Sequence, residues 1–168
     1  YKSGESIYTH DVSGTDDTAE NNTAYGIRAM DAITTGDGNV AFGQRALSGN
    51  TTASNNTAVG YQALIANTTG EINSAFGSLA LAANTVGFGN TAVGRSTLTA
   101  NITGDNNVAL GHQALDNADA ENDNLAIGRD ALGGAIAGGE YNVAVGNYTL
   151  DALTSGDHNV AIGYGAGT

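Results

Sequence analysis

The 168-residue chain has no cysteine, no proline and no tryptophan, and only five lysines and arginines. Without cysteine it can form neither a disulfide framework nor a thiolate site. Against those five cations stand 17 Asp and Glu, for a formal net charge of -12. This argues against a nucleic-acid partner, because binding phosphates requires clustered Lys and Arg. The chain also lacks any run of 18 apolar residues, so no membrane insertion is predicted.

The abundant residues, 25 Gly with many Ala, Asn and Thr, fall into one repeat. Its motif is Asn, a small or branched residue, Ala, an apolar residue and Gly, then two variable positions, Ala or Thr, and Leu. With the Asn as position one, the repeat begins at Asn22, Asn39, Asn56, Asn73, Asn90, Asn107, Asn124, Asn142 and Asn159. The starts are 17 residues apart, except for 18 between the seventh and eighth, with the extra residue in the glycine-rich stretch 133–139. Such a short, regular period is typical of a solenoid.

Each unit favours short strands over a helix, because glycines interrupt a stretch rich in Thr, Asn and Val. Under a period of two, positions two and four share one face and the Ala at position three takes the other. Positions eight and nine form a second extended run, so each coil is expected to contain two strands and two turns. Pairing between successive coils predicts an all-β fold, a parallel β-solenoid or β-roll of nine 17-residue coils. Residues 22–168 form this repeat domain, and the off-pattern residues 1–21 are expected to be an N-terminal cap or a degenerate coil.

The repeated residues have predictable structural roles. Glycine at position five suits a left-handed or crowded corner. The Asn at position one tolerates such a corner and can bond its equivalents in neighbouring coils as an Asn ladder. A second, shorter ladder is expected through Asn50, Asn67, Asn84 and Asn101. The absence of proline fits as well, because each strand has to donate hydrogen bonds to its neighbour.

The apolar content of each coil is modest, and the predicted core consists of positions two, four and nine. Burial of three such side chains leaves little margin over the entropy of ordering a coil. Association of several copies would bury a second face. The alanine column at position three, which permits close approach, is the predicted contact.

The amino-acid sequence of the repeat, as in Asn56-Thr-Ala-Val-Gly-Tyr-Gln-Ala-Leu64, resembles repeats of bacteriophage tail-fibre proteins and large bacterial surface proteins. Asn159-Val-Ala-Ile-Gly163 is similar to the head repeats of trimeric autotransporter adhesins, whose units are shorter. The resemblance covers residues 22–167. It implies a left-handed β-roll, a homotrimer, and a structural or adhesive role in a fibre of a virion or a bacterial surface, with a host glycan or protein as receptor. It implies no catalytic residue, so an enzyme is not predicted.

No constellation of residues predicts catalysis, a metal site or a cofactor. His10, His112 and His158 lie at different positions of different units, which favours exposed repeat positions over a metal or catalytic site. The densest acidic run could supply oxygen ligands for Ca²⁺, but a solvated turn is the favoured interpretation, because Asn124 stands where a calcium loop needs glycine. The run consists of Asp116, Asp119, Glu121 and Asp123, with Asp130 further on.

Threonine pairs recur at positions thirteen and fourteen, and they suggest an alternative function. Thr35, Thr52 and Thr69 follow Thr34, Thr51 and Thr68 in three successive units. A regular Thr array on a monomeric solenoid could bind glycan or ice. Threonines that form turns are the simpler interpretation, and the pattern decays at Asp119-Ala120.

Overall fold

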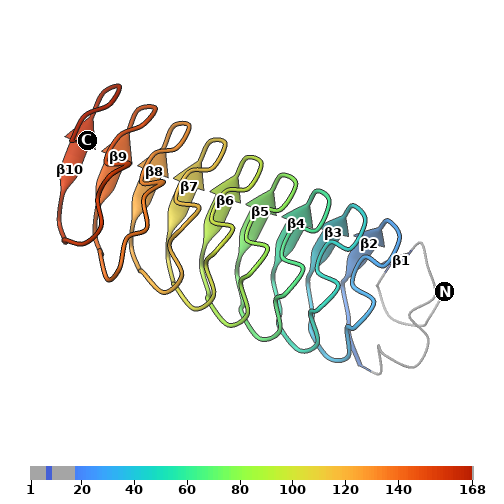
Figure 1. The fold of residues 1–168 in the computed structure, drawn as a ribbon. Helices are drawn as coiled ribbons and strands as arrows, with labels where there is room; N and C mark the ends of the chain where they lie inside the picture. The colour runs from blue at the N-terminus through green and yellow to red at the C-terminus, as the bar shows by residue number, and fades with distance from the viewer. Residues whose placement is uncertain (1–6, 9–17, 168) are drawn as a thin grey trace.

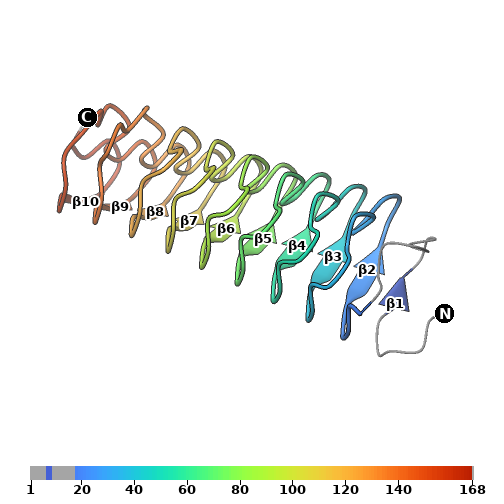
Figure 2. The same cartoon turned by 90° about the horizontal axis from the view of Figure 1, so that it is seen from below.

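The computed structural model describes residues 7–8 and 18–167, which wind into a rod of stacked coils (Figure 1). The strands form one row along the rod (Figure 2). They are β1 (Ile7–Tyr8), β2 (Thr23–Tyr25), β3 (Val40–Phe42), β4 (Thr57–Val59), β5 (Ser74–Phe76), β6 (Thr91–Val93), β7 (Val108–Leu110), β8 (Leu125–Ile127), β9 (Val143–Val145) and β10 (Val160–Ile162). They make a single ten-stranded sheet in chain order, and every neighbouring pair is parallel. The predicted parallel β-solenoid is confirmed.

Each coil has one strand, so the prediction of a second strand at positions eight and nine is wrong. Residues at positions seven and nine adopt left-handed backbone, as Gln62 (φ 57°) and Leu64 (φ 51°) do in the third repeat. This geometry bends the chain through consecutive turns in place of an extended run. The coils remain joined there, because the Leu64 N–H donates to the Ala80 carbonyl at 3.0 Å.

The strand faces are the reverse of those predicted. Ala41, Ala58 and their equivalents in β2–β9 point inward and are at most 1% exposed, whereas positions two and four point outward. The narrow interior is filled by the Ala at position three, by the Ala or Thr at position eight and by a large side chain from position nine, such as Leu64. An alanine column buried within one chain cannot also contact a second chain, so the predicted Ala contact is wrong too.

Glycine at position five is required for both predicted reasons. Gly60 has φ 140°, a conformation that side chains rarely adopt. A Cβ there would also lie 2.4 Å from the carbonyl oxygen of Gly77 in the next coil. The glycine column therefore lets successive corners stack in contact.

Both predicted Asn ladders are present, and they meet at one carbonyl per coil. In the first, the Asn56 N–H donates to Asn39 Oδ1 at 2.9 Å, and Asn56 Nδ2 donates to the Gly70 carbonyl at 2.8 Å. In the second, Asn67 Nδ2 donates to Asn50 Oδ1 at 3.0 Å and to the same Gly70 carbonyl at 2.9 Å. Since all four Asn side chains are buried, the ladders satisfy polar groups that would otherwise be costly to bury.

The hydrogen bonding between coils changes after Asn101, where the second Asn ladder ends. Ala118 takes the ladder position in the next coil, and Asn101 Oδ1 is buried with no hydrogen-bond partner among the described residues. In the same coil Glu121 replaces the usual glycine at position fifteen and is only 3% exposed.

At the other end of the rod, β1 pairs with β2 through Ile7–Thr23 and Tyr8–Ala24. The rest of the predicted N-terminal cap, up to residue 17, lies outside the described residues.

Candidate interaction face

The sheet face is the outward side of β2–β10, formed by the residues at positions two and four. Position four is apolar in every coil: Tyr25, Phe42, Val59, Phe76, Val93, Leu110, Ile127, Val145 and Ile162. Position two is Val or Leu in five coils and Thr or Ser in the others. None of these side chains is fully buried, and Tyr25 and Phe42 remain 58% and 55% exposed. Two adjoining columns of mainly apolar side chains therefore face outward along the rod.

The extent of this face exceeds what scattered surface residues explain. Nine strands spaced by about 4.8 Å span roughly 40 Å, and the three-residue strands that carry positions two and four are about 10 Å wide. The strip is therefore roughly 400 Å² per chain in projection, and contiguous apolar patches of this size are often functional.

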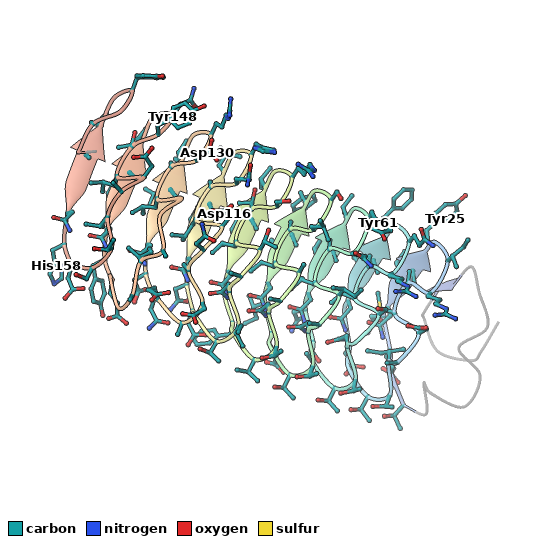
Figure 3. All side chains as sticks on the ribbon, viewed as in Figure 1. Tyr25, Tyr61, Asp116, Asp130, Tyr148 and His158 are labelled. Carbon is teal, nitrogen blue, oxygen red and sulfur yellow. The ribbon has the colours of Figure 1, made fainter. Side chains whose placement is uncertain are left out.

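Aromatic side chains cluster at the N-terminal end of the sheet face. The rings of Tyr25 and Phe42 stack with centroids 4.9 Å apart and planes at 10°. Tyr61, just past the Gly60 corner, is 47% exposed, and Tyr25 and Tyr61 both project outward at this end of the rod (Figure 3). Large exposed aromatics of this kind are enriched in binding interfaces.

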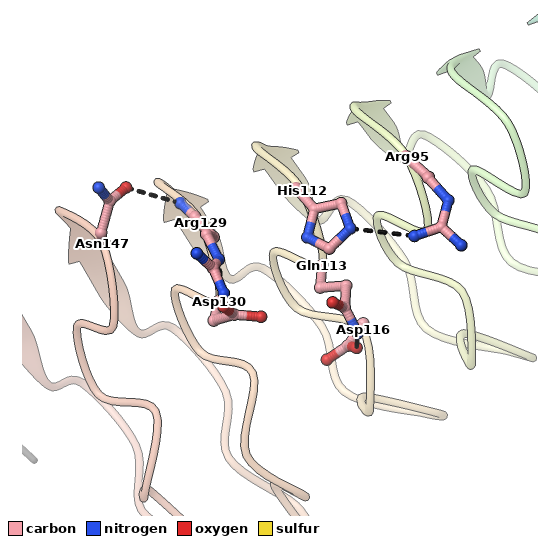
Figure 4. Close-up of polar contacts among 7 residues, drawn as sticks. All are labelled: Arg95, His112, Gln113, Asp116, Arg129, Asp130 and Asn147. Carbon is pink, nitrogen blue, oxygen red and sulfur yellow. Dashed lines mark hydrogen bonds and ion pairs between the residues drawn. The ribbon is translucent and has the colours of Figure 1, made fainter.

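A row of polar side chains follows the corner beyond the sheet face in the C-terminal half (Figure 4). Arg95 Nη1 lies 3.1 Å from His112 Nε2, and because arginine can only donate, the ring nitrogen accepts. Arg129 Nε donates to Asp130 Oδ2 at 3.0 Å, while the backbone N–H of Arg129 donates to Asn147 Oδ1 at 2.9 Å. The row links neighbouring coils by single contacts.

Asp116 is the titratable group that its surroundings perturb most clearly. Burial raises the pKa of its carboxyl above the ordinary 3.8, with a smaller contribution from the negative charge of Asp130. A hydrogen bond from Gln113 Nε2 at 3.1 Å and the nearby His112 oppose this rise in the pKa. The balance destabilises the ionised carboxylate at neutral pH.

The predicted Thr surface has an exposed column and a structural one. Thr35, Thr52 and Thr69 are exposed, one in each of three successive coils. The hydroxyls of Thr34 and Thr68 at position thirteen instead donate to carbonyls of the next coil, both at 2.9 Å. Val86 (49% exposed) interrupts the outer column in the fourth coil, so the array is short.

The other residues weighed for chemistry are not gathered into one site. His112 contacts Arg95, whereas His158 stacks on Tyr141 with ring centroids 5.0 Å apart; His10 lies outside the described residues. Over the described ranges, no group of three or more His, Asp or Glu side chains is placed to hold a metal ion.

Glu121, from the predicted acidic run, is a structural residue. Its Oε2 accepts the N–H groups of Asp119 and Ala120 at 2.9 and 3.1 Å, and its Oε1 accepts that of Gly138 at 2.8 Å. The carboxylate therefore joins its own turn to the 18-residue repeat that follows. Acidic residues at position sixteen similarly bond the preceding coil: Asp105 Oδ1 accepts the Phe88 N–H at 2.8 Å.

Sequence reasoning missed the sheet face because it assigned positions two and four to the core. The available signal was the invariant Ala at position three beside bulkier, variable residues at position four. A constant small residue indicates a confined site, and variable large residues indicate space.

Comparisons with known proteins yielded no match: no family model, no curated protein and no solved structure matches this chain. Within residues 7–8 and 18–167, no helix is long and apolar enough to cross a membrane.

Proposed function

We propose that this chain is a structural and adhesive segment of a fibre, in which several copies pack along their sheet faces. The observation that carries the proposal is the uninterrupted, mainly apolar sheet face, which one chain leaves in water. The family resemblance supports a left-handed homotrimer on a phage tail fibre or a bacterial surface, attached to a host glycan or protein. The role is non-catalytic.

The size of the sheet face supports stable association. The strips of three chains, roughly 400 Å² each in projection, together bury about 1,200 Å², which is at the lower end of the range of specific protein–protein interfaces. Apolar side chains in the centre of the strip, such as Val59 and Val93, supply the desolvation that dominates such contacts. In a trimer, the face of each chain would lie against both neighbours.

The stacking of the coils supports a role as a spacer. The same ladder bonds recur from coil to coil, as in Asn56 to Asn39 and Asn73 to Asn56, both at 2.9 Å. Each coil lengthens the rod by about 4.8 Å. Extension by identical units is what the shaft of a fibre requires.

The decisive test replaces two central residues of the sheet face, Val59→Lys with Val93→Lys, and measures the solution mass by light scattering at micromolar concentration. We expect the unaltered chain to have a mass near three times 16.8 kDa and the variant a mass near 16.8 kDa, because a buried unpaired lysine is costly. The control, Thr52→Lys with Thr69→Lys, adds the same charge outside the face and should keep the larger mass. A single-chain mass for the unaltered protein would contradict the proposed assembly.

A monomeric solenoid that binds glycan or ice through Thr35, Thr52 and Thr69 is the second candidate. It is favoured by the exposure of these three side chains in successive coils, about 4.8 Å apart. Their joint replacement by lysine should abolish binding to a glycan array and inhibition of ice growth, with the circular dichroism spectrum unchanged. A fibre segment that associates through its sheet face would keep its mass in the same variant.

A further inference from the structure

All arginines of the chain lie on one corner of the rod. They belong to the corner row, which we define as positions six and seven, just past the glycine at position five: Arg28, Arg45, Arg95 and Arg129. Among the described acidic residues only Asp130 shares these positions, and it pairs with Arg129 (Nε to Oδ2, 3.0 Å). In a chain of net charge -12, the corner row is therefore a strip of positive charge on a largely acidic surface.

The other three arginines have no carboxylate partner within the described part of the chain. Arg95 Nη1 lies 3.1 Å from His112 Nε2, and the guanidinium groups of Arg28 and Arg45 make no hydrogen bond to any described residue. The acidic column that follows, at position ten, also forms no ion pair with them over the described ranges; it consists of Asp31, Asp116 and Asp151. Because an arginine keeps its charge and presents five N–H donors, these three groups are available to an external anion.

Planar amides and aromatic rings occupy much of the rest of the corner row. Tyr61 is 47% exposed, and the Arg129 guanidinium lies 5.2 Å above the centroid of the Tyr148 ring. The amides are Gln44, Gln62, Gln113 and Asn147. Amide side chains donate and accept hydrogen bonds, as sugar hydroxyls do, and a tyrosine ring offers an apolar surface with a polar edge. The corner row thus combines fixed positive charges with groups that suit a hydroxyl-rich polymer.

We infer that the corner row binds an acidic polysaccharide, extended along the rod, whose carboxylates meet the arginines and whose neutral sugars lie on the amides and tyrosines. The inference rests on the adhesive part of the proposed function and gives it a surface and a ligand class. A guanidinium group binds a carboxylate through two parallel N–H donors. The corner row lies past the corner from the sheet face (Figure 4), which leaves that face for neighbouring chains.

The spacing of the arginines favours this ligand over a nucleic acid. At about 4.8 Å per coil, Arg45 and Arg95 are about 14 Å apart along the rod, and Arg95 and Arg129 about 10 Å apart. A polysaccharide with neutral sugars between its carboxylates has charges at comparable intervals. DNA carries one negative charge per about 1.7 Å of its axis, so most of its phosphates would lie beside an acidic chain without a cation.

Removal of the three unpaired arginines tests the inference in the full chain. The variant is Arg28→Gln with Arg45→Gln and Arg95→Gln. It should fold, because glutamine already occupies position six at Gln44 and position seven at Gln62. The backbone of Gln62 is also left-handed (φ 57°), like that of Arg28 (φ 57°) and Arg45 (φ 60°). The control, Thr35→Glu with Thr52→Glu and Thr69→Glu, changes the net charge equally at exposed threonines of another turn.

Binding is measured by calorimetry with hyaluronan, which has a carboxylate on every second sugar, and with its uncharged methyl ester. We expect the unaltered chain to bind hyaluronan, less tightly as the ionic strength rises, and not to bind the ester. The arginine variant should bind hyaluronan at least about tenfold more weakly, since it loses three charge pairs. The threonine control should bind nearly as well as the unaltered chain.

Four outcomes would overturn the inference: no binding of the unaltered chain to hyaluronan, equal binding to the ester, undiminished binding by the arginine variant, or binding to an oligothymidylate instead. Loss of binding in the threonine control alone would place the ligand on the threonine column and also overturn it. Light scattering separates this inference from the proposed assembly. A mass of 16.8 kDa for the unaltered chain would contradict the assembly, whereas hyaluronan binding would still support the corner row. A mass lowered by the arginine substitutions alone would show that the arginines act between chains and overturn the inference.

Discussion

The coils that begin at Asn39, Asn56, Asn73 and Asn90 differ from the coil that begins at Asn107 in the groups that hydrogen-bond the turn at position fifteen. In the former, two buried Asn side chains donate to the position-fifteen carbonyl, as Asn73 and Asn84 do to Gly87 at 2.8 and 3.0 Å. In the coil that begins at Asn107, only Asn107 donates to the Glu121 carbonyl, at 2.7 Å. The Glu121 carboxylate holds the turn instead. The fold therefore needs a buried polar anchor at this turn, and it accepts more than one kind.

The difference also explains where the extra residue is tolerated. The 18-residue repeat directly follows the coil with Glu121, and Glu121 Oε1 accepts the N–H of Gly138 within the glycine-rich stretch. A long, charged side chain reaches a displaced backbone better than the short Asn side chain of a ladder. We infer that the carboxylate and the insertion accommodate each other.

The largest loss of stability is expected at the position-five glycine, which both kinds of coil share. Gly77→Ala places a Cβ 2.2 Å from the Gly94 carbonyl oxygen at φ 145°. Backbone strain and overpacking should together cost about 4 kcal/mol, a fall in Tm of about 8–16 °C. The control is Gly163→Ala, at φ 121° with no described atom within 4 Å of the added Cβ. Calorimetry should show a much smaller loss there, and equal losses would refute the crowding explanation.

Removal of the carboxylate anchor should have the next largest effect. Glu121→Gln replaces one accepting carboxylate oxygen by an NH₂ group, which donates hydrogen bonds and cannot accept one. The loss is expected to be about 2 kcal/mol, since hydrogen bonds to a charged group each contribute about 1.5–3 kcal/mol. Urea unfolding gives the difference, and hydrogen exchange should increase first at Gly138. Glu71→Gln, the same change at an exposed side chain, should be nearly neutral.

Extension of the second ladder should have a smaller, favourable effect. Ala118→Asn offers Nδ2 to the unpaired Asn101 Oδ1 and to the Glu121 carbonyl, as its equivalents do in the regular coils. We expect a gain of about 1 kcal/mol in urea unfolding. Ala118→Leu, which adds volume without a donor, is the control and should destabilise. A loss in the Asn variant would show that the irregular coil excludes the ladder.

The smallest expected effect is on the pH dependence of stability. Because burial raises the pKa of Asp116 above 3.8 in the folded chain, the unfolded chain binds fewer protons in the window above 3.8. The contribution of this group to stability is therefore fully present below pH 3.8 and is lost as the pH rises through the folded pKa. Asp116→Asn should remove this part of the pH dependence of Tm between pH 4 and 7, and an unchanged profile would contradict it.

Most of the fold could be predicted because the repeat makes columns. A column of Asn at position one, or Gly at position five, has one physical explanation when stacked. The inward face could not be predicted by period-two alternation, which separates Ala58 from Val59 but does not say which is inside. The interior is narrow because left-handed residues such as Leu64 turn the chain early and then fill the space themselves.

The role of Glu121 could not be predicted for the opposite reason. It occurs once in the repeat, so no column reveals it, and an acidic residue in an acidic run resembles a solvated turn. The sheet face stayed hidden because apolar residues on alternate positions of a strand usually indicate the core. In a coil this small, the inward site at position three has room for alanine but not for a residue as large as Phe42 or Phe76.

Because the coils keep a constant register, the length of this molecule can change by whole repeats. Asn56 and Asn73 make equivalent bonds to the preceding coil, so deleting residues 56–72 would join Asn55 to Asn73 and recreate the same junction. Recombination between repeats can then shorten or lengthen the rod in steps of about 4.8 Å without designing a new contact. In a protein built in this way, the number of repeats encoded in the gene sets the length of the rod.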